Sequence, residues 1–172
     1  MRTSQQGIDL IKHYESLNDG DLSEVGLQPK MDPKGIWTEG YGHAMVYQGI
    51  FLNGAENKKL AENLTTVHSE PDAVRVLAYD LAKVEQTIDS LDLNLSQNQF
   101  DAIVSITYNI GYGNFSQSTL LRRIVMKSDD EMITDAFLMW NKCAGQVLAG
   151  LTFRRQSEAL LFTTGELKFF NN

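Results

Sequence analysis

Residues 31–45 read MDPKGIWTEGYGHAM, and this segment is the clearest indication of the fold class. Its first part, residues 32–35 (DPKG), has the composition of a tight turn. The β-branched and aromatic side chains of residues 36–43 (IWTEGYGH) then predict strands. We therefore expect a small β-sheet in the N-terminal part of the chain.

Outside this stretch, apolar residues recur three and four positions apart, which is the spacing of one face of an α-helix. Thr3 and Gln6 form a capping-box pattern, as do Ser96 and Gln99. The predicted class is α+β, mainly helical, with a small N-terminal sheet. Helices are predicted from Thr3 to Glu15 and at residues 71–91, 96–110, 118–126, 128–140 and 152–162.

The length of 172 residues fits a single domain made of two lobes. We expect residues 15–70 to form a sheet-containing lobe and residues 71–91 to form a long linking helix. Residues 92–172 and the N-terminal helix would form the helical lobe. A lone cysteine, Cys143, cannot make an internal disulfide, so the fold depends on packing alone.

Charge and hydropathy argue against two classes of partner. The formal net charge is −7, whereas nucleic-acid binding relies on clustered Lys and Arg, so no nucleic acid is expected. Residues 1–16 are polar where a signal peptide carries its apolar segment. No later run approaches the roughly 20 apolar residues that span a bilayer. We therefore expect a chain made without an export signal and without stable membrane insertion.

Glu15 ends the apolar stripe of the N-terminal helix, after Ile8 and Ile11. Burial disfavours the charged form of a carboxyl group, and an acid that keeps its proton near neutral pH can donate it to a leaving group. Glu15 is therefore a candidate general acid. Judged from the stripe alone, an exposed glutamate at a helix end is the more common arrangement.

Five residues separate Asp32 from Thr38. This spacing can place a carboxylate and a hydroxyl on the two arms of a hairpin, facing the same opening, where together they can hold a water molecule. Taken alone, an Asp before Pro33 is more often a turn former, and Thr38 would be an ordinary strand residue. Both interpretations stay open at this point.

These residues resemble the signature of the phage-type lysozymes, glycoside hydrolase family 24. That signature is a helix-borne Glu, then an Asp, five residues, a Thr and a Gly-x-Gly-His tail. Here the positions are Glu15, Asp32, Thr38 and residues 40–43 (GYGH). The resemblance spans nearly the whole chain. It continues in residues 97–102 (QNQFDA), 108–111 (YNIG), 115–116 (FS), 118–121 (STLL), 150–151 (GL), 154–156 (RRQ) and Glu158.

The resemblance implies a lysozyme-like fold and an N-acetylmuramidase activity. Such an enzyme cleaves the β-1,4 bond between N-acetylmuramic acid and N-acetylglucosamine in bacterial peptidoglycan. Glu15 would protonate the leaving oxygen, while Asp32 and Thr38 would position a water that attacks the anomeric carbon from the opposite face. Such an inverting hydrolysis needs carboxyl groups roughly 6.5–9.5 Å apart.

The family also implies supporting residues around the site. Arg154 matches an arginine that pairs with the catalytic Glu, although its neighbour Arg155 leaves an ambiguity of one residue. His43 matches a histidine that pairs with an acid on the long helix, here Asp80. For each of these two pairs, an ordinary surface ion pair is the alternative. The residues where the family contacts sugar rings are Tyr108, Asn109 and Ser118. For these three, core packing or helix capping is the alternative.

The loop at residues 16–30 is longer than is usual in the family. It contains three acids that could replace Asp32. We keep Asp32, because its spacing to Thr38 and to the GYGH tail is the one that the family has. The three loop acids are then solvated charges: Asp19, Asp21 and Glu24.

No metal and no other cofactor is expected, because His13, His43 and His68 lack metal-ligand spacing.

The resemblance also implies a binding partner and a place of action. The expected partner is the glycan strand of peptidoglycan, bound by a monomer of phage or prophage origin. An endolysin of this kind would be made in the cytoplasm of the bacterial host. It would need a separate membrane-perforating protein before it could act on the cell wall.

Two other functions stay open for this chain. A lytic transglycosylase needs the Glu but makes an anhydro product without a water-holding Asp, so Asp32 and Thr38 disfavour it. A non-catalytic peptidoglycan-binding protein would grip glycan without cutting it, and such a binder has no need of a desolvated acid at Glu15.

Overall fold

The computed structural model describes residues 1–17, 20 and 26–171. Helices predominate, and the short strands pair antiparallel. The predicted class, α+β and mainly helical, is confirmed. Within the described residues, none of the helices has the length and apolar character needed to cross a membrane.

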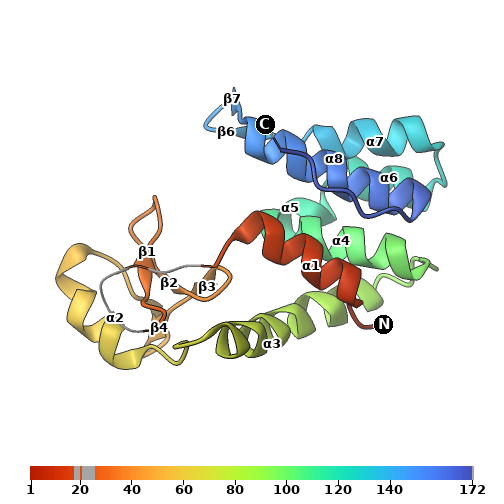
Figure 1. Ribbon diagram of the computed structural model, residues 1–172. Helices are drawn as coiled ribbons and strands as arrows, with labels where there is room; N and C mark the ends of the chain where they lie inside the picture. Colours follow the sequence, from red (N-terminus) through yellow and green to blue (C-terminus); the bar gives the residue numbers. More distant parts are fainter. Residues whose placement is uncertain (18–19, 21–25, 172) are drawn as a thin grey trace. The chain divides into compact units, whose positions relative to one another are not determined.

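The chain divides into two compact units, which are described separately (Figure 1). One unit consists of Met1–Tyr14 and Leu81–Asn172, and the other is Glu15–Asp80. The chain passes from one unit to the other inside two helices, α1 (Gln5–Glu15) and α3 (Glu70–Asp89). The predicted single-domain organisation with its lobes stays a prediction.

The unit that contains both chain ends has its core around α4. Residues 100–107 of this helix are all buried, which is typical of a helix surrounded by other elements. The last helix, α8, packs against α4 and α7 (Figure 1). The elements of this unit after α3 are α4 (Gln97–Ile110), α5 (Tyr112–Ser116), α6 (Thr119–Val125), α7 (Asp130–Leu138), β6 (Lys142–Cys143), β7 (Gln146–Val147) and α8 (Ala149–Thr164).

Helix caps in this unit follow the sequence closely. The capping box of Ser96 and Gln99 is present at the start of α4, and Ser118 caps α6. For α7 the prediction was wrong by one residue, because Asp129 rather than Ser128 is the cap. An Asp side chain accepts a hydrogen bond from an early helix amide as well as a Ser does.

The predicted capping role of Thr3 is wrong. Its amide and hydroxyl donate to Glu85 Oε1 at 2.8 and 2.7 Å, and the Arg2 guanidinium donates to Oε2 at 2.7 Å. Helix α1 begins later, at Gln5. Burial raises the pKa of Glu85, but the hydrogen bonds from Thr3 and Arg2 outweigh it and hold that pKa below its usual value. Thr3 thus donates to a carboxylate distant in sequence instead of accepting from the first amides of the helix.

The unit Glu15–Asp80 is built on a three-stranded antiparallel sheet in the order β1-β2-β3. Its core cluster combines Trp37, Met45 and Leu52 with Ala61 from α2. The elements before α3 are β1 (Lys30–Met31), β2 (Trp37–Glu39), β3 (His43–Ala44), β4 (Val46–Tyr47), β5 (Ile50–Phe51), η1 (Ala55–Asn57) and α2 (Lys58–Leu64).

Helix α2 was not predicted. It has seven residues and buries only Ala61, so it carries too little apolar periodicity to be seen in the sequence. Helix α3, which follows, carries Asp72 in its first turn. The Ser69 hydroxyl, the Arg75 guanidinium and the His68 amide donate to Asp72 and lower the pKa of its carboxyl to about 2.

Glu39 is a buried carboxylate that ties β2 to the segment before α3. Its side chain is 5% exposed. Oε2 accepts from the Thr65 hydroxyl at 2.6 Å and from the Thr66 and Val67 amides at 2.9 and 3.3 Å, and Oε1 accepts from the Thr66 hydroxyl at 3.0 Å. Because Glu39 follows Thr38 directly, these bonds also fix the strand that carries Thr38.

We expect Glu39→Leu to lower the free energy of unfolding by about 3 kcal/mol or more, because it leaves several buried donors without an acceptor. Glu39→Gln should cost less. Its oxygen can replace Oε2, and its amide nitrogen can donate to the Thr66 hydroxyl, which can rotate to accept. Urea unfolding of both variants measures the difference. Equal losses of unfolding free energy in Glu39→Leu and Glu39→Gln would show that Glu39 does not stabilise the fold through these hydrogen bonds.

Candidate active site

One pocket brings the three predicted catalytic residues together inside the unit Glu15–Asp80. Its volume is about 540 Å³, which is within the range of small-ligand sites. Glu15 is the last residue of α1, Asp32 follows β1, and Thr38 is the middle residue of β2. The other lining residues, which sequence reasoning did not single out as site residues, are Lys30, Met31, Pro33 and Gly42.

Asp32 is both a turn former and a pocket residue. Its Oδ1 accepts from the Lys34 and Ile36 amides, each at 2.8 Å, and its own amide donates to the Ile36 carbonyl at 2.7 Å. These bonds hold the carboxylate in one orientation at the pocket wall. No hydrogen bond to Oδ2 is present in the described part of the chain, so this oxygen is the one available to a ligand.

The hydroxyl of Thr38 lines the pocket and already donates a hydrogen bond within the protein. Lys30 and Thr38 are paired in the β1-β2 ladder, and Thr38 Oγ1 donates to the Lys30 carbonyl at 2.9 Å. The residue is 8% exposed. A hydroxyl that donates elsewhere can only accept from a bound water. Thr38 and Asp32 would thus both accept from a water held between them.

Glu15 is half-buried, and its carboxylate lies against Gly42. A Cβ added at Gly42 would stand 3.3 Å from Glu15 Oε2, and Gly42 has a φ of +87°. Glycine is therefore needed here for two reasons, the left-handed backbone and the close approach of the carboxylate. Within the GYGH segment, Gly42 is the residue that lines the pocket beside the candidate acid.

We expect Gly42→Ala to lower turnover about tenfold, since a displacement of the acid by a few tenths of an ångström disturbs its alignment. Gly49→Ala is the matched control. Gly49 has a φ of +81°, but nothing lies within 4 Å of an added Cβ there. Both variants should lose about 1 kcal/mol of stability from backbone strain, measured by thermal unfolding. Equal activity in the two variants would contradict a close role for Gly42.

His43 and Asp80 are brought together, with Nδ1 2.7 Å from Oδ2. The contact joins the end of the GYGH segment to α3. Both side chains are partly buried, at 30% and 17% exposure. The effect of this pair on catalysis stays a prediction.

The model of the phage lysozyme family matches residues 22–158. This chain belongs to the phage lysozyme family. The endolysin of Bacillus phage B103 is 34% identical over 169 residues, which cover 98% of this chain and 56% of that protein. The endolysin of Salmonella phage P22 is 34% identical over 163 residues, covering 94% of this chain and 98% of the relative.

A solved structure of the endolysin from Escherichia coli O157:H7 phage FAHEc1 matches with a TM-score of 0.74 and 26% identity. The match covers 98% of this chain and 97% of that one. This chain spans little more than half the length of the Bacillus phage relatives, 56% and 57%, and nearly all of the P22 relative.

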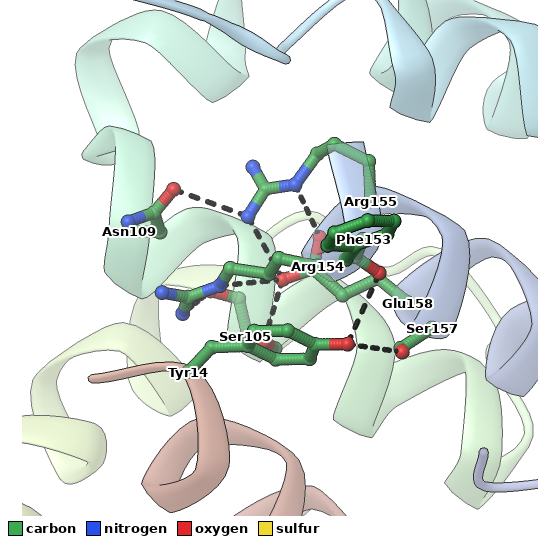
Figure 2. A network of polar contacts seen from close by, with 8 residues as sticks. All are labelled: Tyr14, Ser105, Asn109, Phe153, Arg154, Arg155, Ser157 and Glu158. Carbon is green, nitrogen blue, oxygen red and sulfur yellow. Dashed lines mark hydrogen bonds and ion pairs between the residues drawn. The ribbon is translucent and has the colours of Figure 1, made fainter. Parts of the chain in front are cut away.

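The arginines expected from the family share one buried carboxylate, Glu158, in the other unit (Figure 2). Arg154 Nε donates to Glu158 Oε1 at 3.1 Å, and Arg155 Nη2 donates to the same oxygen at 3.0 Å. The Ser105 hydroxyl also donates to Oε1, at 2.7 Å. The sequence analysis assigned no partner to Glu158, although its spacing of four from Arg154 is typical of a helical ion pair. The pairing of Arg154 with Glu15 joins different units and stays a prediction.

The three residues predicted to contact sugar differ in exposure. Tyr108 is half-buried and Asn109 is exposed, both near the end of α4. Ser118 is 4% exposed, and its hydroxyl accepts from the Leu121 amide at 3.0 Å. Helix capping, the alternative considered for Ser118, is therefore present. Sugar binding by the three residues stays a prediction.

The three acids considered as replacements for Asp32 lie outside the described residues. The preference for Asp32 over Asp19, Asp21 and Glu24 thus stays a prediction, supported by the position of Asp32 in the pocket.

Proposed function

We propose that this chain is a lysozyme that hydrolyses the β-1,4 bond between N-acetylmuramic acid and N-acetylglucosamine in bacterial peptidoglycan, with inversion at the anomeric carbon. One observation carries the proposal. Glu15, Asp32 and Thr38 line a single pocket, so a proton donor and a pair of water acceptors face the same space.

In this proposal Glu15 donates its proton to the glycosidic oxygen as the bond from that oxygen to the anomeric carbon breaks. A water held by Asp32 and Thr38 directs its lone pair at the anomeric carbon, because both of its hydrogens point to acceptors. The new carbon–oxygen bond forms on the opposite face, and the water proton passes to Asp32. The hydroxyl of Thr38 orients the water and exchanges no proton.

The remaining roles are part of the same proposal. The contact of His43 with Asp80 would hold the GYGH segment against Glu15. Tyr108 and Asn109 would contact the glycan. The chain would act as a monomer on the cell wall, after release from the host by a separate membrane-perforating protein.

Mass spectrometry of fragments released from purified peptidoglycan tests the reaction. We expect reducing muramic-acid ends, which only hydrolysis produces. Anhydro-muramic ends would instead establish a lytic transglycosylase, and no release at all would indicate a non-catalytic binder. Proton NMR of the first product from a short oligosaccharide should show the α-anomer. A β-anomer would contradict inversion.

A further inference from the structure

Lys30 brings a positive charge to the pocket that contains the candidate catalytic carboxyl groups. Of the described residues that line this pocket, Lys30 is the only basic one, and Glu15 and Asp32 are the acidic ones. Lys30 is the first residue of β1 and is exposed. The lining residues all belong to the unit Glu15–Asp80, so this arrangement of charges is set within one unit.

The register of the sheet places the Lys30 side chain on the same face as that of Thr38. Lys30 is paired with Thr38 across β1 and β2, and directly opposite residues of an antiparallel pair point to one face. The pairing continues to Asp32, whose amide donates to the Ile36 carbonyl at 2.7 Å. Because side chains alternate along a strand, Asp32 lies on that face as well. Lys30 thus shares a face with the two residues proposed to hold the water.

The ammonium group of Lys30 has neither an ion-pair partner nor a hydrogen-bond partner among the described residues. The backbone of the same residue is held, because its carbonyl accepts from the Thr38 hydroxyl at 2.9 Å. An ammonium offers three hydrogen-bond donors at the end of a flexible stem of four carbons. It can therefore bind an anionic group that enters the pocket without giving up a contact within this part of the chain.

We propose that Lys30 is a substrate-binding residue that pairs with a carboxylate group of peptidoglycan. The inference rests on the proposed function, because it takes the glycan strand as the occupant of this pocket. Peptidoglycan carries carboxylates in two places: on the lactyl group of muramic acid where no stem peptide is attached, and in the stem peptides. Neutral polymers of N-acetylglucosamine carry none. Lys30 thereby selects carboxylate-bearing glycan over neutral glycan.

The charge of the whole chain makes a local cation important. The formal net charge is −7, which disfavours the approach of an anionic polymer. A positive group beside the candidate catalytic residues offsets this repulsion at the place where the substrate must bind, and complementary charges of this kind fix the orientation of a partner.

Binding of matched charged and neutral glycans tests the pair. Glu15→Gln protein, in which cleavage is expected to be slow, is titrated calorimetrically with a peptide-free tetrasaccharide of peptidoglycan and with the same glycan carrying stem peptides. Each ligand is used with free and with methyl-esterified carboxyl groups. Adding Lys30→Gln should weaken binding of a charged ligand about fivefold, which corresponds to about 1 kcal/mol, and should leave binding of the esters unchanged.

The two glycans distinguish the source of the carboxylate. Weaker binding of the peptide-free ligand identifies the lactyl carboxylate, and weaker binding of the peptide-bearing ligand alone identifies a stem-peptide carboxylate. If Lys30→Gln weakened the free and esterified forms of both glycans equally, or weakened neither form of either glycan, the inference would be overturned.

Two further substitutions control for charge. Lys30→Arg keeps the positive group and should keep the affinity for the charged ligand. Lys59→Gln removes the same charge from an exposed position of α2 that does not line the pocket, and should leave the affinity unaltered. An equal loss in Lys59→Gln and Lys30→Gln would reflect net charge and would contradict a pair at Lys30.

Kinetics with Glu15 intact separates substrate binding from an influence on the catalytic acids. Lys30→Gln should raise KM for peptidoglycan about fivefold and leave kcat and its pH profile unchanged. A fall in kcat or a displaced pH profile would show that Lys30 acts on Glu15 or Asp32, and would overturn the binding role. Fragments released by the variant still carry either reducing or anhydro ends, so the proposed hydrolysis is decided independently of Lys30.

Discussion

Glu15→Gln should lower the rate of peptidoglycan hydrolysis by roughly 10³-fold, the range that positioned general acids contribute. The substitution keeps the shape of the side chain but replaces an acid with an amide that cannot deliver its proton to the departing oxygen. Glu15 is the last residue of α1 and is half-buried, so the change should leave the fold nearly intact.

The matched control for this variant is Glu62→Gln, a change of the same kind on the surface of α2. Turbidity clearance of cell walls and thermal unfolding should be close to wild type in the control. If Glu15→Gln cleared the walls at the wild-type rate, Glu15 would not be the acid, however well it is placed in the pocket.

Asp32→Asn should reduce hydrolysis by roughly 10²-fold or more, because an amide is a poor acceptor for the proton of the attacking water. The fold should survive this change. The Oδ1 of asparagine can accept from the Lys34 and Ile36 amides as the aspartate does, so the turn is retained. The substitution thereby separates the turn-forming role of Asp32 from its chemical role.

The loop acids provide the controls for Asp32. Asp19→Asn, Asp21→Asn and Glu24→Gln should each keep most of the activity, measured on the same peptidoglycan. A large loss in one of these variants, together with near-normal activity in Asp32→Asn, would move the second carboxylate into the loop.

Features that depend on neighbours along the chain could be predicted from the amino-acid sequence. The box of Ser96 with Gln99 and the cap at Ser118 join groups three residues apart, so the local pattern was sufficient. The turn at Asp32 and its spacing to Thr38 followed from the same short range, and the motif order indicated the family. Ser128 and Asp129 are neighbouring candidates for the cap of α7, and the cap predicted from the sequence was wrong by one residue.

Interactions between groups that are distant in sequence became visible in the folded structure and had no local sequence pattern. The Thr3 hydroxyl bonds Glu85, 82 residues away, and the Glu39 carboxylate collects donors from Thr65–Val67, a partnership with no sequence signature. Arg155 Nη2 donates to Asn109 Oδ1, 46 residues away. The physical reason is that a buried charged group must be satisfied by whatever packing brings within about 3 Å of it, and this choice is made by the folded core rather than by local propensity.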